Sequence, residues 1–299
     1  MKDSLLIDLG GTNIRHAFLI DNVLSKPVKK KIEDKDFYSY LSELISNTDK
    51  NLVNLVIAAA GPNIQHSINL TNRNLVIDAK ELEDKLKIHN CHLLNDWEAV
   101  GYSLKELNSN SFQILKNGSP KNENYLLIGP GTGLGLTLIL NNQVIPTELG
   151  NTLSGSSNLL KNFNLSENDS FNTIEDVLSG PGLEKLYKVK YKETKSAEDI
   201  VNFALSGEEK EKFIVEAFLK SLTQIINDLI LSFSLENVIL GGSILNSLES
   251  FLLNEKFINY FLSEINPKYS FLADRAEIKL IKESEPGIYG CLAFLKKAG

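Results

Sequence analysis

The sequence predicts an α/β protein, and three observations indicate this fold class. Apolar segments of strand length alternate with segments of helical spacing along the 299 residues. Two similar segments, LLIDLGGTNIRHAFLI at 5–20 and LLIGPGTGLGLTLIL at 126–140, are each typical of a strand, a glycine-rich loop and a second strand. No low-complexity linker interrupts the chain, so we expect hinges, not a flexible tether, between any two domains.

The first half of the chain alternates helices and strands. Residues 37–52 have helical spacing, and LVIAAAGP at 55–62 is typical of a buried strand that ends at Gly-Pro. A helix is predicted from Asp78, which forms a capping box with Glu81. The segment CHLLNDWEAVGYSLKEL at 91–107 then changes from strand to helix at Asn95 and Asp96.

The second half is mostly helical from about residue 155 to 234, after the second glycine-rich segment. NVILGGSI at 237–244 predicts a strand and a glycine turn, and residues 276–297 predict a strand, a Pro-Gly turn and a final helix. The two strand–glycine–strand segments are explained equally well by a duplicated core and by chance similarity between two hairpins. The sequence leaves both explanations open.

Composition excludes several classes of protein. A formal net charge of −7 and a pI near 5.3 give no general attraction to nucleic acid or to an anionic membrane. The two cysteines, Cys91 and Cys291, lie in apolar surroundings and form neither a disulfide framework nor a C-x-x-C metal site. The N-terminal apolar run ends at Asp8, too early for a signal peptide, and no segment is long enough to span a membrane. We therefore expect a cytoplasmic protein in a reducing compartment.

Three glycine turns predict a nucleotide site. The first, DLGGTN at 8–13, offers backbone N–H groups and polar side chains to phosphate oxygens, and Asp8 could hold Mg²⁺ through its water shell. The second, GPGTGLG at 129–135, has glycine at every second residue, which matches neither the dinucleotide motif nor the P-loop. The third, LGGS at 240–243, could lie flat against a purine. Tight turns use the same residues for conformational reasons alone, but three in this order favour a nucleoside triphosphate.

Asp96 is the candidate catalytic residue. It lies where a buried strand meets a helix, and a carboxylate there could accept a hydroxyl proton as a phosphoryl group moves to the oxygen. The alternative is that Asn95 or Asp96 simply caps the helix. Position alone favours capping.

The motifs DLGGTN, LLNDWEAVG, IGPGTGLGL, PTELG, VLSGPGLEKLY, VILGGSI and PGIYGCLAFL occur in the order found in bacterial glucokinases. The chain resembles this ATP-dependent group of the hexokinase and actin-like ATPase superfamily over nearly its whole length. The resemblance implies two ribonuclease-H-like domains with a cleft between them, a small one of residues 1–106 plus 287–299 and a large one of 107–286. It also implies transfer of the γ-phosphoryl group of MgATP to the 6-hydroxyl of glucose, and suggests a homodimer.

The same resemblance assigns roles to individual residues. Asp96 is the general base, and Asn95 holds the sugar beside it. Glu148 and Glu175 accept hydrogen bonds from sugar hydroxyls. The nucleotide is bound by a first phosphate loop of Asp8, Gly10, Gly11, Thr12 and Asn13, a second loop with Gly131 and Thr132, and an adenosine turn with Gly241 and Gly242.

Two departures from the family pattern leave the sugar open. The family has E-G-G-H after the first sugar carboxylate, whereas Glu148 is followed by Leu149, Gly150 and Asn151. Asn151 can still donate and accept a hydrogen bond, but it lacks the shape of imidazole. Family members have Trp where this chain has Leu75. A kinase for another hexose or an amino sugar, and a sugar or nucleotide sensor without catalysis, are the alternatives.

Overall fold

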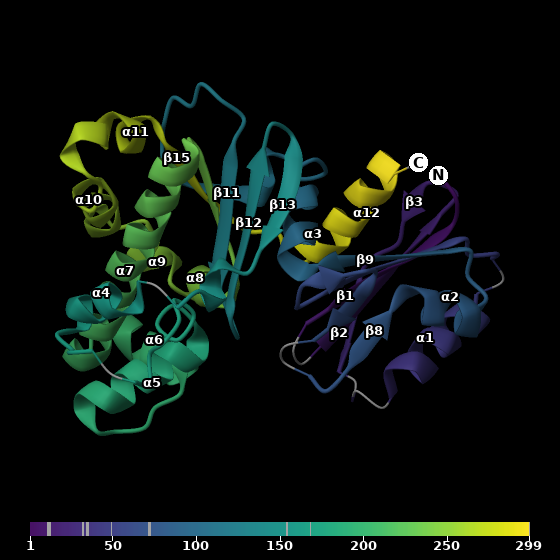
Figure 1. Ribbon diagram of the computed structural model, residues 1–299, viewed down its shortest axis with the longest axis horizontal. Helices are drawn as coiled ribbons and strands as arrows, with labels where there is room; N and C mark the ends of the chain where they lie inside the picture. The colour runs from purple at the N-terminus through teal and green to yellow at the C-terminus, as the bar shows by residue number, and fades with distance from the viewer. Residues whose placement is uncertain are drawn as a thin grey trace. The chain divides into compact units, whose positions relative to one another are not determined.

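The chain folds into two units. The structure is a computed structural model that describes residues 1–10, 13–31, 33, 36–48, 50–70, 73–153, 155–167 and 169–298. One unit comprises Met1–Asn110 with Glu283–Gly299, and the other comprises Ser111–Lys282 (Figure 1). The sequence places these boundaries after residue 106 and before residue 287. Within the described residues, no helix is both long enough and apolar enough to cross a membrane.

The first unit is built on a mixed sheet in the order β3-β2-β1-β5-β9, with β4 paired to β2. Strands β1, β5 and β9 are parallel to one another, and β2 is antiparallel to β1. A separate small sheet has the order β6-β7-β8. The strands are β1 (Ser4–Leu9), β2 (Asn13–Ile20), β3 (Val23–Leu24), β4 (Val28–Lys31), β5 (Asn54–Ala59), β6 (Asn63–Ile64), β7 (Ser67–Asn69), β8 (Val76–Asp78) and β9 (Asn90–Asn95).

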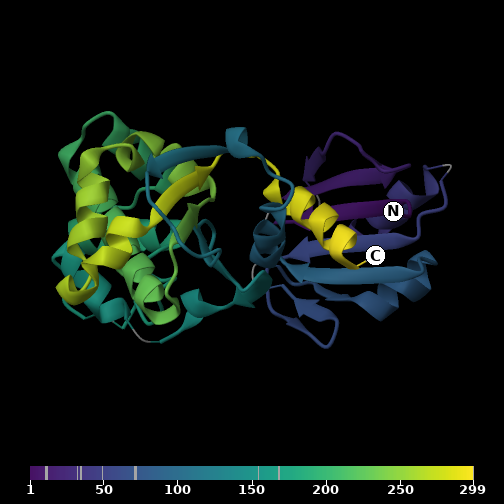
Figure 2. The same ribbon diagram turned by 90° about the horizontal axis from the view of Figure 1, so that it is seen from above.

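Helices cover both faces of this sheet. The helices are α1 (Phe37–Ser46), α2 (Ala79–Leu86), α3 (Asp96–Ser103) and α12 (Pro286–Ala298). Alternate residues of β1, namely Leu5, Ile7 and Leu9, join a buried cluster with side chains of α1 and α2. Helix α12 lies across the strands of the same sheet (Figure 2) and contacts α3, β1 and β5. The C-terminal helix therefore completes the N-terminal unit.

The second unit repeats this topology. Its sheet has the order β10-β15-β14-β11-β12-β13, with β11, β14 and β15 parallel and β12 antiparallel to β11. The order β13-β12-β11-β14-β15 is the order β3-β2-β1-β5-β9 of the first unit, with the same directions for the paired strands. The strands are β10 (Phe112–Lys116), β11 (Tyr125–Pro130), β12 (Leu134–Leu140), β13 (Gln143–Thr147), β14 (Asn237–Leu240) and β15 (Glu277–Ile281).

This repeat decides between the two explanations that the sequence left open. The segments 5–20 and 126–140 both form the first two strands of their sheets, at equivalent places in the same order. Two hairpins that resemble each other by chance would not predict the matching positions of the following parallel strands. The structure therefore favours the duplicated core.

The helices of the second unit form one large core with its sheet. They are α4 (Ser156–Leu160), α5 (Gly180–Tyr191), α6 (Ala197–Leu205), α7 (Glu209–Phe233), α8 (Ser243–Ser247), α9 (Glu249–Leu252), α10 (Glu255–Ser263) and α11 (Ser270–Arg275), with 3₁₀ turns that include Leu149–Asn151. Phe218 of α7 is fully buried in the cluster that also holds Leu126 and Ile128 of β11. This confirms the helical stretch expected between residues 155 and 234.

One local expectation is wrong. Pro286 and Gly287 do not form a turn before the last helix, because α12 begins at Pro286. Proline at the first helical position has the backbone angle that a helix needs, and its missing N–H group would have no partner inside the helix. The helix consequently starts close to Asp8: a Cβ atom on Gly287 would lie 2.8 Å from the Asp8 Cγ.

Candidate functional site

The carboxyl ends of β1, β5 and β9 form a polar edge in the first unit. The register pairs Leu9 with Ala59, and Ala59 with Asn95, so the three strands end at the same level. Asp8 lies one residue before this level, and Asp96 follows it as the first residue of α3. Two strand spacings separate Leu9 from Asn95, about 10 Å. The fold thus gathers Asp8, Asn95 and Asp96 at one edge of the sheet.

Asp8 is paired with a cation that the sequence analysis did not select. The Nη1 atom of Arg15 on β2 lies 3.4 Å from the Asp8 Oδ2, and the Nε atom of Arg15 pairs with the Glu285 carboxylate. Burial raises the pKa of Asp8, and the charge of Arg15 partly offsets this. Glu285, also with a pKa raised by burial, directly precedes α12. Arg15 therefore links the first glycine loop to the C-terminal helix.

Asn95 is the N-cap of α3. Its Oδ1 accepts hydrogen bonds from the backbone N–H groups of Trp97 (2.9 Å) and Glu98 (3.1 Å), and its Nδ2 donates to the Gly61 carbonyl oxygen (3.2 Å). Glu98 accepts from the Asn95 N–H, which completes a capping box. The spacing Asn-x-x-Glu is the sequence signature of such a box. Asn95 therefore caps α3, as the alternative allows.

Asp96 is not the N-cap, because Asn95 has that role. Asp96 is half-buried, and its Oδ1 accepts the Trp97 N–H at 2.9 Å. A carboxylate in the first turn of a helix interacts favourably with the positive end of the helix dipole. The capping alternative is therefore met by Asn95 and not by Asp96, whose carboxylate stands at the polar edge.

The first glycine turn is described only in part. The Gly10 N–H donates to the Asn13 carbonyl oxygen at 3.0 Å, which closes a tight turn between β1 and β2. Gly11 and Thr12, both predicted to bind phosphate, lie outside the described residues. Asp8 lies within β1, Gly10 follows the end of that strand, and Asn13 is the first residue of β2.

In the second unit, the glycine loop between β11 and β12 is joined to two other turns. The Gly131 N–H donates to the Gly133 carbonyl oxygen (2.7 Å), and the Gly131 carbonyl oxygen accepts the Gly180 N–H at the start of α5 (2.8 Å). Thr132 lies exposed between the two loop glycines. Both backbone polar groups of Gly131 are therefore hydrogen-bonded, one within the loop and one to α5.

The turn after β14 packs against the same loop. The Gly241 N–H donates to the Ile128 carbonyl oxygen at 3.1 Å. Gly242 has φ of +89°, and a Cβ atom there would lie 2.8 Å from the Pro130 carbonyl oxygen. Both its backbone angle and its surroundings require glycine. The structure thus brings the second and third predicted nucleotide turns together.

The two predicted sugar carboxylates lie near each other in this unit. The charge of Glu175 helps to raise the pKa of Glu148, although desolvation by the surrounding protein is the larger cause. The Asn151 Nδ2 donates to the Glu148 Oε2 at 3.4 Å and lowers this pKa. The Glu175 N–H donates to the Gly150 carbonyl oxygen at 2.8 Å. Glu148, Asn151 and Glu175 therefore form one polar cluster.

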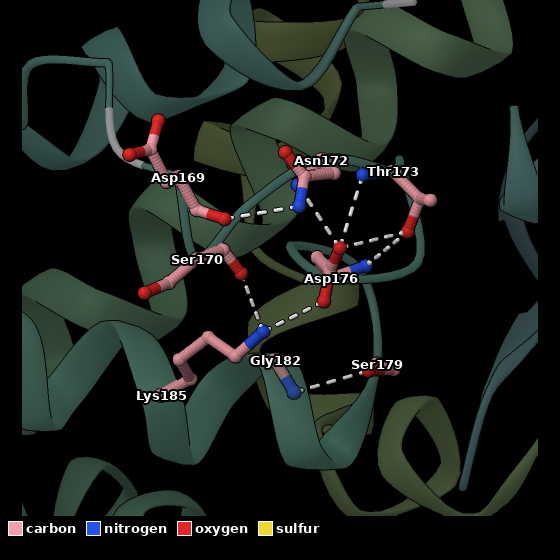
Figure 3. Close-up of polar contacts among 8 residues, drawn as sticks. All are labelled: Asp169, Ser170, Asn172, Thr173, Asp176, Ser179, Gly182 and Lys185. Atoms are coloured by element: carbon pink, nitrogen blue, oxygen red, sulfur yellow. Dashed lines mark hydrogen bonds and ion pairs between the residues drawn. The ribbon is translucent and has the colours of Figure 1, made fainter. Parts of the chain in front are cut away.

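The turn that carries Glu175 is fixed by its neighbour Asp176 (Figure 3). The Asp176 Oδ2 accepts the N–H groups of Asn172 and Thr173 and the Thr173 hydroxyl, at 3.0–3.1 Å. Its Oδ1 accepts from the Lys185 Nζ of α5 at 2.7 Å. These contacts outweigh the cost of desolvation and hold the pKa of Asp176 below its usual value. Sequence analysis did not identify this network, because only the fold brings Lys185 to the turn.

Solved structures share this fold over almost the whole chain. Glucokinase from Balamuthia mandrillaris in complex with glucose has a TM-score of 0.80 at 20% identity, and the match covers 97% of this chain and 92% of that one. A ROK-family glucokinase from Streptomyces griseus in complex with glucose and AMPPNP has a TM-score of 0.71 at 14% identity, with 99% and 100% covered. These likenesses show that this chain shares the α/β fold of those structures.

The sequence comparisons identify the family. The sequence profile of the Glucokinase family matches residues 5–298, so this chain belongs to that family. A glucokinase from Colwellia psychrerythraea is 29% identical over 323 residues, which cover 98% of this chain and 96% of the relative. The resemblance inferred from the motifs is thereby confirmed.

Proposed function

We propose that this protein is an ATP-dependent glucokinase that transfers the γ-phosphoryl group of ATP to the 6-hydroxyl of glucose. The observation that carries this proposal is the placement of Asp96 at the polar edge of the first unit, after an N-cap that is already supplied by Asn95. Family membership supports the same activity. The relative from Streptomyces griseus was solved with glucose and AMPPNP, an analogue of ATP, which supports both substrates.

Asp96 acts as the general base in this proposal. As the bond from the sugar oxygen to phosphorus forms and the bond to the leaving ADP oxygen breaks, the hydroxyl proton passes to the Asp96 carboxylate. The half-buried position of Asp96 limits its contact with bulk water. The hydrogen bond from the Trp97 N–H to Oδ1 fixes the direction of the carboxylate.

Glucose is recognised by carboxylates and amides, because it offers only hydroxyl groups and a ring oxygen. We assign Glu148, Glu175, Asn151 and Asn95 to these hydroxyls. A sugar that lacks one of the hydroxyls would leave a polar group unpaired, which typically costs about 1–3 kcal/mol when the group is desolvated. This cluster thus provides a physical basis for selecting among sugars.

The three glycine turns bind the nucleotide in this proposal. We assign the first phosphate loop to Asp8, Gly10, Gly11, Thr12 and Asn13, the second to Gly131 and Thr132, and the adenosine contact to Gly241 and Gly242. The close packing of the second loop against Gly242 supports a preformed surface at this loop, in which the Gly131 N–H donates internally to the Gly133 carbonyl oxygen.

The residues present also fit a magnesium ion that arrives with the nucleotide. Mg²⁺ is commonly bound by one or two carboxylates together with phosphates and water. Asp8 supplies one such carboxylate at the first phosphate loop, and Arg15 offsets the charge of this carboxylate when no Mg²⁺ is bound. Bound there, Mg²⁺ would neutralise phosphate charge; Asp8 would hold it through water.

A kinase for another hexose is the second candidate, and Asn151 is the observation that favours it. Its Nδ2 donates to the Glu148 Oε2. In the family motif this position is histidine, whose imidazole differs from an amide in shape. Leu149 adds a side chain next to it where the family has glycine. Both changes affect the sugar cluster and leave Asp96 and the nucleotide turns intact.

The test is MgATP-dependent phosphorylation of a panel of hexoses and amino sugars by the wild type and by Asp96→Asn. We expect turnover with glucose, and a loss in kcat of about 10²–10⁴-fold in Asp96→Asn, the usual contribution of a general base. Glucose binding, measured by calorimetry, should persist in the variant. Faster turnover with another hexose would favour the second candidate.

Glu98→Gln is the matched control. It makes the same carboxylate-to-amide change two residues along α3, and glutamine can still accept the Asn95 N–H. We expect it to retain nearly full activity. A wild type that binds glucose or ATP but phosphorylates no sugar would contradict the proposed kinase activity. A sensor of sugar or nucleotide would then be the remaining explanation.

A further inference from the structure

Glu175 contacts the glycine loop as well as the sugar cluster. Its Oε2 accepts the Leu134 N–H at 2.7 Å, at the point where the loop enters β12. Its own N–H donates to the Gly150 carbonyl oxygen in the 3₁₀ turn that follows Glu148. One residue thus joins the loop assigned to phosphate with the turn assigned to sugar.

The backbone of Glu175 has little freedom to move. Its neighbours Ile174 and Val177 are 5% and 0% exposed, so both anchor the turn in the core. Between them, Asp176 is tied to Lys185 of α5 and to the N–H groups of the same turn (Figure 3). Any adjustment at Glu175 must therefore occur in its side chain.

Gly133 is in close contact with that side chain. A Cβ atom on Gly133 would lie 2.6 Å from the Glu175 Oε2 and 3.0 Å from its Cδ. Carbon and oxygen atoms cannot approach so closely without repulsion, so any larger residue here would push the carboxylate away from the Leu134 N–H. Gly131, two residues earlier in the same loop, has no atom within 4 Å of its corresponding Cβ position.

We propose that Gly133 and the Leu134 N–H are positioning groups for the sugar-binding carboxylate of Glu175, so that the second glycine loop sets the affinity for sugar. This inference rests on the proposed function, in which Glu175 binds a sugar hydroxyl. Gly133 supplies the space that the carboxylate occupies, and the Leu134 N–H fixes its direction. The loop thereby acts on the sugar before any nucleotide is bound.

The experiment is a calorimetric titration of glucose into the nucleotide-free full-length protein, for the wild type, Gly133→Ala and Gly131→Ala. Displacing one charged hydrogen-bonding group should raise the glucose Kd of Gly133→Ala about tenfold to a hundredfold. Its KM for glucose should rise in parallel, with a smaller change in kcat. The glucose Kd of Gly131→Ala should stay within about twofold of the wild type, since that Cβ displaces nothing.

A double-mutant cycle with Glu175→Asp separates positioning from general damage. Aspartate is one methylene shorter, so its carboxylate withdraws from the space that a Cβ atom on residue 133 would fill. We expect Gly133→Ala to weaken glucose binding much less in the Glu175→Asp background than in the wild type. If Gly133→Ala alone does not fold, the double variant should fold and bind glucose as Glu175→Asp does.

Three results would overturn the inference: wild-type glucose affinity in Gly133→Ala, an equal loss in Gly131→Ala, or strictly additive effects in the cycle. Failure of the proposed function would be recognised differently. In that case the wild type itself would not phosphorylate glucose, whether or not it bound the sugar, and the variants would not be needed to show it.

Discussion

At the scale of single residues, Glu148 is the group whose proton most directly controls the proposed sugar site. Desolvation and the charge of Glu175 raise its pKa, and the hydrogen bond from Asn151 lowers it. Only the ionised carboxylate accepts hydrogen bonds through both oxygens. Glucose binding should therefore weaken as the pH falls through the raised pKa of Glu148.

Asn151→Ala removes the hydrogen bond that lowers the pKa of Glu148 and leaves the two influences that raise it. The pKa of Glu148 should then rise further, so the glucose Kd should begin to increase at a higher pH than in the wild type. The measurement is the glucose Kd as a function of pH, with each variant normalised to its own value at neutral pH. In Glu148→Gln, which has no carboxyl group to titrate, this pH dependence should be missing. If the wild-type and Asn151→Ala profiles superimposed, the assignment of the pH dependence to Glu148 would be contradicted.

At the scale of elements, helices α12 and α3 pack closely together at Gly290. Among the glycines described, Gly290 leaves the least space for a Cβ atom. A Cβ atom on Gly290 of α12 would lie 1.8 Å from the Ala99 carbonyl oxygen of α3. Backbone cannot give way as a flexible side chain can. The two helices hold Asp96 and Glu285 at the polar edge, so their separation would disturb both.

Gly290→Ala should destabilise the protein by about 1–3 kcal/mol or more, as expected for overpacking a tight contact. A decrease in the free energy of unfolding would identify the close contact, because Gly→Ala inside a helix otherwise stabilises by about 1 kcal/mol. Urea unfolding provides the measurement. Lys296→Ala on the same helix should cost less than about 1 kcal/mol, because it removes an ion pair with Glu106 in which the lysine side chain is 45% exposed. A stabilised Gly290→Ala would refute the close approach.

The elements also show what the sequence could predict. Periodicity and turn residues were sufficient for the strand-to-helix change at Asn95, the glycine turns and the long helical region, because local patterns determine these features. The contacts of Arg15 with Glu285, of Gly133 with Glu175 and of Asp176 with Lys185 were not predictable. Each joins residues from different elements, and their distance depends on the packing of the complete unit. The roles of the site residues came from the family resemblance and remain proposals.

At the scale of the whole molecule, the two units have separate hydrophobic cores. One cluster includes Leu5, Phe37 and Leu82, and the other includes Leu126, Phe218 and Phe261; among the residues that the structure describes, none belongs to both clusters. Chains with two cores often depart from two-state unfolding. We therefore expect the unliganded protein to unfold in two separable thermal transitions.

Trp97 allows these transitions to be assigned, because it is the only tryptophan and lies in α3 of the first unit. Its fluorescence should follow the unfolding of that unit, whereas circular dichroism at helical wavelengths should follow mainly the helix-rich second unit.

Our proposal assigns Asp96 of the first unit and Glu148 of the second to the same sugar. Glucose at 100 times its Kd should then stabilise the sugar-binding state by about 2.7 kcal/mol and bring the two transitions together. Sorbitol at the same concentration controls for the general effect of a polyol on stability. If glucose raised only one transition, a single unit would be sufficient to hold the sugar, and the assignment of Asp96 and Glu148 to one substrate would be wrong.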